Sequence, residues 1–365
     1  MFVALAVLSL IPTVQRPRDE GPDLTLDAAT RTTVIETLAR ELDGNYVFPD
    51  VGKAMNAKVR ARLAAKGYDS ITSARAFAEE LTKDLQSVSR DKHMRVRYRS
   101  EAIPQRPPRA AQPEQPSPEE MEEFRREEAR NNFGFFKVER LEGNIGYVDM
   151  RAFVPADIAR EKATAVMAFV ADTDALIFDL RKNGGGSPDQ IAWLCSYLFE
   201  GRVHLNDIYM RPEDRTEEFW TNPGVPGTKY LDKPVYVLTS DYTFSGAEEF
   251  AYNLKTQKRA LIVGETTGGG ANPGGMARLH EHFAAFIPMG RAINPITKTN
   301  WEGTGVEPDV KIEEDRALAK ACVLALEHLV AEQPRVLPIE RAEALAGRRK
   351  ELEATPRPVE AREER

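Results

Sequence analysis

Ser245 lies where a strand-like segment gives way to a helix-like one, within PVYVLTSDYTFSGAEEF. A serine at such a turn can project from the edge of a sheet while the next backbone N–H groups point forward as donors, which suits a nucleophile. The same residues also fit a capping box, with Ser245 as N-cap and Glu248 at the third helical position. They do not fit the G-x-S-x-G elbow, because positions 243 and 247 are Thr and Ala. The pattern alone leaves both roles open.

Glycine-rich loops follow two other strand-like segments, at residues 184–186 after ALIFDLRKN and at residues 268–270 after ALIVGETT. Backbone without side chains can approach a ligand closely, and its N–H groups can hold an oxyanion. Phosphate binding is the competing interpretation. Neither the Gly-Lys-Ser/Thr of a P-loop nor a G-x-G-x-x-G opening a helix occurs here. A glycine triplet by itself is more often a tight turn than a ligand-binding site.

A serine nucleophile needs a base, and the spacing of the histidines does not choose one. His328 lies in a helix-like stretch and is expected to be structural. His280 and His282 fall on one face of an expected strand and suggest a metal pair, but no HExxH motif or spaced carboxylate accompanies them. His93, in Asp91-Lys92-His93-Met94, would by default be a surface histidine. The chain has five histidines in all, at positions 93, 204, 280, 282 and 328.

The secondary-structure elements that would position these residues fall into two regions with different hydrophobic patterns. Residues 27–100 repeat apolar side chains at helical spacing and predict three amphipathic helices, with Ser73 as an N-cap, so a helical domain is expected at 25–100. A Pro-rich and charged linker follows at 101–132, in which 119–130 reads as a solvated helix.

From Asn144 onward, strands and helices alternate. This alternation predicts an α/β fold with a largely parallel sheet, and the loops that carry Ser245 and the glycines should meet at the carboxyl ends of its strands. We expect a catalytic domain at 133–335 and a charged, poorly patterned tail at 336–365. The expected strands are 145–150, 175–180, 234–240, 260–263, 276–288 and 306–312, and the expected helices are 155–172, 188–199, 246–257 and 316–330.

Composition and charge exclude several classes of protein. The 365 residues include 50 Lys and Arg and 57 Asp and Glu, a formal net charge of −7 that offers no footprint for nucleic acid. The cysteines, Cys195 and Cys322, lie in apolar stretches and are expected to be core residues, not a disulfide scaffold or a metal cluster.

The first residues, MFVALAVLSLIPTV, are apolar and precede the charged run RPRDE. They are too few to span a bilayer comfortably and predict a signal segment at 1–20, with a buried strand as the alternative. The mature protein would then work outside the cytoplasm, in the periplasm or secreted, with no stable membrane span, or stay membrane-tethered if the segment is uncleaved.

Four ordered motifs together resemble the S41 family of serine peptidases, the tail-specific or C-terminal processing proteases. They are ALIFDLRKNGGG, PVYVLTSDYTFSGAEEFAYNL, ALIVGETTGGG and EGTGVEPDV. The resemblance covers roughly residues 133–332, and the helical segment with DKHMRV resembles the N-terminal domain of the branch that includes the tricorn core and the interphotoreceptor retinoid-binding protein. It implies a crotonase/ClpP-like sheet-and-helix catalytic domain preceded by a small N-terminal helical bundle.

The resemblance also implies a set of catalytic residues. Ser245 matches the family nucleophile, and Gly270 stands where the processing branch has a lysine base. The other branch uses a histidine from a D-x-H segment, matched by His93, and a carboxylate matched by Glu302 in EGTGVEPD. The backbone N–H groups of Gly246 and of the glycine triplet, Gly185 in first place, would hold the oxyanion.

These roles describe a serine endopeptidase that acts on unstructured polypeptides without metal or cofactor. Its activity should rise with pH through a histidine titration near about 6.5. The alternative is a non-catalytic protein that binds a hydrophobic ligand on the same fold, as the retinoid carrier of this branch does. Residues 94–143 are too few for the linker, the charged segment and a PDZ domain, so the resemblance does not imply recognition of substrate C-termini, and the sequence leaves that point open. The sequence leaves the oligomeric state open.

Overall fold

The computed structural model describes residues 21–104 and 117–354, and its contacts divide the chain into two units. The expected signal segment and residues 105–116 of the expected linker lie outside the described residues. The first unit comprises Met1–Glu119, Asp207–Glu218 and Gly270–Gly303, and the second comprises Glu120–Asn206, Phe219–Gly269 and Thr304–Arg365.

The second unit is built on a six-stranded sheet in the order β12-β8-β7-β4-β3-β2. All neighbouring strands run parallel except β2, which pairs antiparallel with β3 at the edge. The α/β prediction is therefore confirmed, and four of the predicted strands form the centre of this sheet. The bounds are β2 Phe135–Leu141, β3 Ile145–Met150, β4 Ala175–Asp179, β7 Val235–Thr239, β8 Leu261–Gly264 and β12 Val310–Lys311.

Helices cover both faces of the sheet, as expected for buried parallel strands. On one face, buried residues of α8 such as Ala321, Cys322 and Leu326 pack against Ile177 and Leu238 of the central strands. The other face presents the alternate residue Phe178, whose ring lies 5.2 Å from that of Phe250 on α7. The helices are α4 Pro118–Arg130, α5 Ala156–Val170, α6 Pro188–Cys195, α7 Gly246–Thr256, α8 Glu314–Glu332 and α9 Pro338–Ala354, with the short 3-10 turn η2 Asn132–Gly134.

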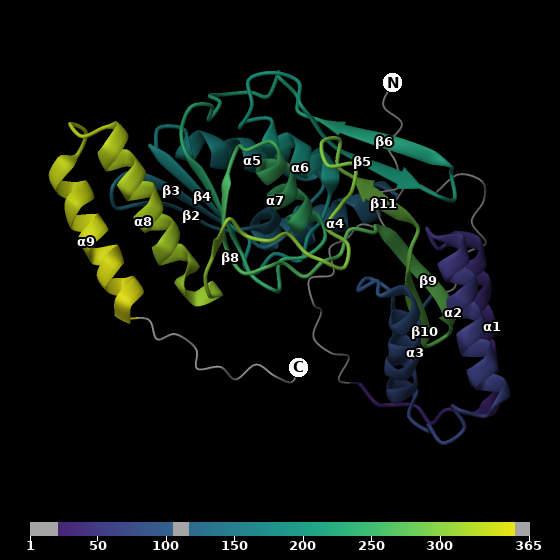
Figure 1. Ribbon diagram of the computed structural model, residues 1–365. Helices are drawn as coiled ribbons and strands as arrows, with labels where there is room; N and C mark the ends of the chain where they lie inside the picture. The colour runs from purple at the N-terminus through teal and green to yellow at the C-terminus, as the bar shows by residue number, and fades with distance from the viewer. Residues whose placement is uncertain (1–20, 105–116, 355–365) are drawn as a thin grey trace. The chain divides into compact units, whose positions relative to one another are not determined.

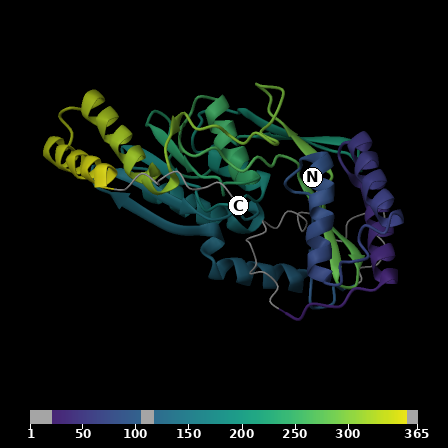
Figure 2. The same cartoon turned by 60° about the horizontal axis from the view of Figure 1, so that its bottom comes forward.

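The expected charged tail at 336–365 contains a helix that the sequence analysis did not predict. Residues 338–354 form α9, which lies beside α8 in both views (Figures 1 and 2). The sequence gives no clear apolar pattern for this helix, because α9 buries only Arg341 and Ala344. The Arg341 guanidinium is fully buried and donates to Asp174 Oδ2 at 2.6 Å. A charged residue therefore anchors α9, whereas sequence analysis looks for a stripe of apolar residues.

The first unit contains the three predicted helices, α1 Ala28–Asn45, α2 Pro49–Ala64 and α3 Ala74–Ser89, and Ser73 caps α3 as predicted. They pack against one another, as expected for a small helical bundle. Their apolar side packs against an antiparallel sheet in the order β1-β10-β9. Figure 1 shows β9 and β10 beside the three helices. For example, the ring of Phe77 meets that of Phe283 edge-on at 6.0 Å. The strands are β1 Arg95–Tyr98, β9 Gly274–His280 and β10 Phe283–Pro288.

A second small sheet has the order β11-β5-β6, with β5 His204–Met210, β6 Arg215–Trp220 and β11 Gly290–Ile293. The sequence analysis missed β5 and β6. Both cysteines are buried and free, as predicted. Among the described residues, no helix combines the length and the apolar composition that crossing a bilayer requires.

Candidate active site

Ser245 occupies the turn between the end of β7 and the start of α7, where its backbone adopts φ +55° and ψ −123°. A residue with a side chain rarely adopts a positive φ, and such strain persists only where the surroundings enforce it. An ordinary N-cap serine has extended backbone dihedrals instead. The turn therefore holds Ser245 in a geometry that a simple helix cap does not require, while its side chain stays partly exposed.

The carboxylate of Glu248 ties this turn to a neighbouring loop of the same unit. Its Oε2 accepts the backbone N–H of Ser245 at 2.8 Å, and its Oε1 accepts the Thr267 hydroxyl at 2.5 Å and the Gly269 N–H at 2.6 Å. Glu248 is fully buried. The capping box predicted from Ser245 and Glu248 is thus present, with both of its hydrogen bonds. Glu248 also fixes the loop after β8.

The glycine triplet packs directly against the Ser245 turn. A side chain at Gly185, whose φ is +111°, would come within 2.7 Å of the Gly246 nitrogen and 2.9 Å of Ser245 Cβ. A side chain at Gly246 would in turn meet the Gly186 nitrogen at 2.8 Å. Only glycine fits these contacts, so the two loops after β4 and β7 do converge as the sequence indicated.

The backbone donors of this region differ in their availability. The Gly185 N–H, the first expected oxyanion donor of the triplet, donates to Asn183 Oδ1 at 2.8 Å. Within the described part of the chain, the N–H groups of Gly186 and Gly246 have no such acceptor. Asn183 is fully buried, and its Nδ2 donates to the Met150 carbonyl at 3.2 Å, so the loop is anchored to the sheet.

Glu249, the next residue of α7, is buried in the interior of the second unit. Burial raises the pKa of its carboxyl to about 8, against the smaller lowering effect of hydrogen bonds from Asn206 and Asn253. The group is therefore neutral near pH 7, which avoids the cost of an unpaired buried charge.

His93 lies in the first unit, on the turn between α3 and β1. Arg90 ends α3 in the left-handed conformation, with φ +58°, and Asp91 Oδ1 then accepts the His93 N–H at 2.9 Å. The imidazole stacks on Phe286 of β10, with ring centroids 5.6 Å apart and planes 26° from parallel. The expectation of a surface histidine is wrong, since the His93 side chain is only 10% exposed.

The pKa values of this turn follow from burial. Burial lowers the pKa of His93 to about 3, with a smaller contribution from the nearby Arg95 charge, so the imidazole is neutral and able to accept a proton. Burial raises the pKa of Asp91, although Asn272, Tyr46 and the His93 N–H all donate to its carboxylate.

Glu302 is brought to the same place within the first unit. One nitrogen or oxygen from each of Asp91, His93 and Glu302 lies within 4.8 Å of the other two. The Ala271 N–H donates to Glu302 Oε2 at 2.6 Å and fixes the carboxylate. The structure thus joins two of the three predicted catalytic residues, although 209 positions separate them in the sequence.

Among the other histidines, His204 stacks on Trp220 with the ring centroids 4.1 Å apart. His328, which was expected to be structural, is exposed on α8. His280 and His282 do not share one face of a strand as expected, because β9 ends at His280 and His282 lies in the following turn, with its Nδ1 at 2.9 Å from the Arg99 carbonyl oxygen.

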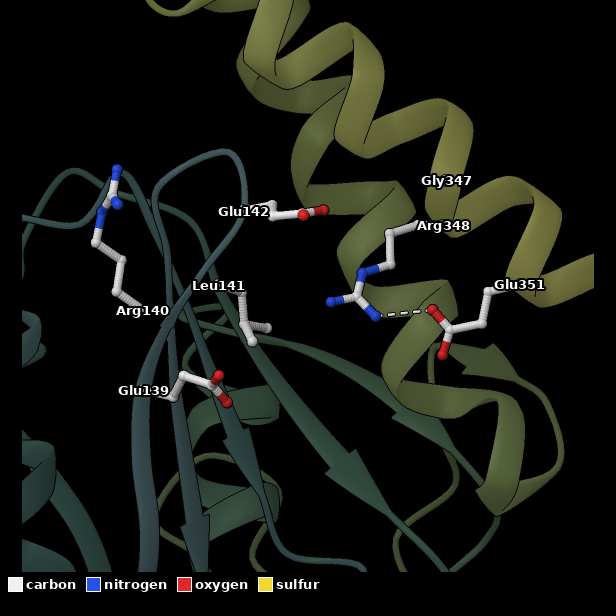
Figure 3. Close-up of a pocket in the computed structure, with 7 residues that line it drawn as sticks. All are labelled: Glu139, Arg140, Leu141, Glu142, Gly347, Arg348 and Glu351. Carbon is white, nitrogen blue, oxygen red and sulfur yellow. Dashed lines mark hydrogen bonds and ion pairs between the residues drawn. The ribbon is translucent and has the colours of Figure 1, made fainter.

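A separate hollow of about 370 Å³ lies in the second unit between β2 and α9, and Figure 3 shows its lining. Charged side chains of both signs line most of it, including Glu139 and Arg140. On α9, Arg348 donates a hydrogen bond to Glu351 at 2.7 Å. None of the predicted catalytic residues lines this hollow, and nothing in its lining resembles a nucleophile with a base.

Two family models match the chain. Residues 144–312 match the model of Peptidase family S41, and residues 24–128 match the N-terminal domain of Peptidase_S41 in eukaryotic IRBP. The chain belongs to peptidase family S41. The sequence resemblance to this family of serine-type peptidases is therefore confirmed, including the branch indicated by the N-terminal segment.

The chain is also similar to individual proteins, in sequence to one relative and in fold to solved structures. The chain is 26% identical over 172 residues to the chloroplastic carboxyl-terminal-processing peptidase 2 of Arabidopsis thaliana. The matched segment covers 45% of this chain and 31% of the Arabidopsis protein. The chain therefore spans only about a third of this relative. A presumed peptidase from Parabacteroides merdae matches with a TM-score of 0.57 at 20% identity, covering 81% of this chain and 96% of its own. A lipoprotein from Streptococcus agalactiae matches with a TM-score of 0.52 at 12% identity, covering 80% and 95%.

Three residues of these S41 motifs were given no role in the catalytic prediction from sequence. Glu248 clamps the Ser245 turn, Asn183 holds the glycine loop, and Asp91 holds the His93 loop. The Asp-x-His spacing was a usable signal for Asp91, because an Asp side chain commonly bonds the backbone N–H two residues on. The bond that Asn183 makes to Gly185 follows the same rule.

Proposed function

We propose that this S41 family member is a serine endopeptidase that cleaves unstructured polypeptides, with Ser245 as nucleophile, His93 as general base and Glu302 as the carboxylate partner. The observation that carries the proposal is the strained backbone of Ser245 at the β7–α7 turn, held by the buried carboxylate of Glu248. The neutral imidazole of His93 beside Glu302 supports the assignment of the base.

In this mechanism His93 removes the hydroxyl proton of Ser245 as the oxygen attacks a peptide carbonyl, and later gives that proton to the leaving amine. Water then hydrolyses the acyl-enzyme with His93 again acting as base. Glu302 would orient the imidazole and stabilise the positive charge that it acquires. This positive form is disfavoured by burial, so a fixed carboxylate close to His93 is what the chemistry requires.

The oxyanion would be held by backbone donors of the second unit. Gly246 N–H is one such donor, and its partner comes from the glycine triplet. Gly185 serves only if it releases Asn183, whereas the N–H of Gly186 needs no such change. Loss of one donor of this kind typically costs about 3 kcal/mol of transition-state stabilisation.

We further propose that the enzyme acts outside the cytoplasm, since residues 1–14 are apolar and precede a charged run. The Arabidopsis relative is named as a carboxyl-terminal-processing peptidase. For the present chain we propose internal cleavage, because residues 94–143 contain β1, the linker and α4, and leave too few positions for a domain that captures C-termini.

Labelling with a fluorophosphonate serine probe tests the proposal without knowledge of the substrate. We expect one adduct per chain, located at Ser245 by peptide mass, and its loss in Ser245→Ala and His93→Ala. Ser187→Ala is the matched serine control, since its buried hydroxyl already bonds to Asp189, and it should label like the wild type. Absence of labelling in folded wild-type protein, together with a hydrophobic ligand extracted from it, would favour the non-catalytic alternative.

A further inference from the structure

The cluster of Asp91, His93 and Glu302 combines donor types that a transition-metal ion prefers. It offers one imidazole and two carboxylates within the first unit, from ligand atoms that all lie within 4.8 Å of one another. Asp91 Oδ1 is 4.0 Å from His93 Nδ1. Imidazole with carboxylate suits Zn²⁺, whereas Mg²⁺ and Ca²⁺ take oxygen ligands.

The spacing of the cluster is close to what coordination requires. In a tetrahedral Zn²⁺ site, bonds of about 2.0–2.2 Å place neighbouring ligand atoms roughly 3.3–3.5 Å apart. The ligand atoms, which lie within 4.8 Å of one another, would move closer together on binding the ion to reach these separations. Three protein ligands leave the fourth position for water, as in other zinc sites of this type.

The surroundings of the cluster hold its ligands in place, and the Arg95 charge lies near His93. Asp91 receives hydrogen bonds from the Tyr46 hydroxyl, the Asn272 amide and the His93 N–H, which are all neutral groups. A buried carboxylate with neutral donors is expensive, and a bound cation would offset that cost. The bond from the Ala271 N–H orients Glu302, as partners behind a metal ligand commonly do.

We propose that Asp91, His93 and Glu302 form an inhibitory Zn²⁺ site. The inhibitory part rests on the proposed function, in which His93 is the general base. A neutral imidazole has one lone pair, because its other nitrogen carries the proton. When Zn²⁺ takes that lone pair, His93 has nothing left with which to accept the Ser245 proton. The same ion also engages the Glu302 carboxylate.

Metal binding is measured first, with Zn²⁺ alone and the chelator-treated full chain. We expect calorimetry to give one Zn²⁺ per chain, with affinity lowered by about 10-fold or more in Asp91→Asn and in Glu302→Gln. Glu281→Gln and His282→Ala are matched controls from the exposed turn after β9, and they should bind like the wild type. Co²⁺ added to the wild type should give the visible spectrum of a low-symmetry nitrogen and oxygen site, a readout that needs no variant. Absence of Zn²⁺ binding, or binding that only His282→Ala weakens, would overturn the proposal.

Inhibition is measured next, as the rate of fluorophosphonate labelling at Ser245. We expect Zn²⁺ to slow labelling at least about 10-fold and EDTA to restore it, whereas Mg²⁺ has no effect. Labelling that proceeds unchanged with the cluster occupied would overturn the inhibitory role. If the protein binds one Zn²⁺ through the cluster but never labels, the metal site stands and the peptidase proposal fails.

Discussion

Replacing Glu249 by Gln tests whether the buried carboxyl of this α7 residue is neutral in the folded protein. Burial raises its pKa from 4.5 to about 8, so the folded state keeps the proton over a range in which the unfolded chain loses it. Stability from this group is therefore fully present below pH 4.5 and is lost as the pH rises toward 8. At about 1.4 kcal/mol for each unit of pH, the loss is about 3 kcal/mol at pH 7 and below about 1 kcal/mol at pH 5.

Gln has nearly the same shape and does not titrate, so Glu249→Gln should lack this loss. Urea unfolding followed by circular dichroism at pH 5, 6, 7 and 8 should show the stability of the variant rising relative to the wild type by about 2–3 kcal/mol between pH 5 and 7. Glu332→Gln, at the exposed end of α8, is the matched control and should track the wild type at every pH. A difference between Glu249→Gln and wild type that stays constant with pH would refute the reasoning.

Three further outcomes are expected. With EDTA present, kcat/KM should stay flat between about pH 5.5 and 7.5 instead of rising near 6.5. The reason is that burial lowers the pKa of His93 to about 3, so the base is already neutral over this range. A rise in kcat/KM with a midpoint near about 6.5 would contradict this expectation. Gly185→Ala should cut the rate of probe labelling at least about 100-fold, because the new Cβ forces the Ser245 turn to move, and labelling at the wild-type rate would show that the turn tolerates it. Arg341→Met should lower the free energy of unfolding by about 3–5 kcal/mol by leaving Asp174 without its buried partner, and Arg349→Met, at an exposed pair, should change it by less than about 1 kcal/mol.

The central strands and the turn that carries Ser245 could be predicted because their signals are local. Continuous apolar runs such as 175–179 mark strands buried on both faces, and the loop composition after each strand marks the ligand-binding edge. In contrast, β5 and β2 carry polar and charged residues among the apolar ones, as in HLNDIYM, and edge or half-exposed strands of this kind give no clear period.

The features that escaped the sequence analysis depend on contacts between distant positions. Asn272 donates to Asp91 across 181 positions, and the burial of His93 depends on packing that no neighbouring residue specifies. The hydrogen bond from the Gly185 N–H to the Asn183 side chain is local in sequence. Even so, the spacing of the glycines does not indicate which of their N–H groups remains available to bind an oxyanion. The catalytic roles of Ser245, His93 and Glu302 stay predictions that the labelling experiments address.

The way in which the first unit closes its core also constrains how the chain folds during synthesis. Tyr98 of β1 pairs with Phe283 of β10, 185 positions later, so the apolar side of the three helices has no cover until that strand has left the ribosome. At roughly 5–20 residues per second, the nascent helices wait about 10–40 seconds for their partner. During that interval their apolar faces are open to chaperones or to misassembly. Slow translation upstream of position 274 would lengthen this exposure.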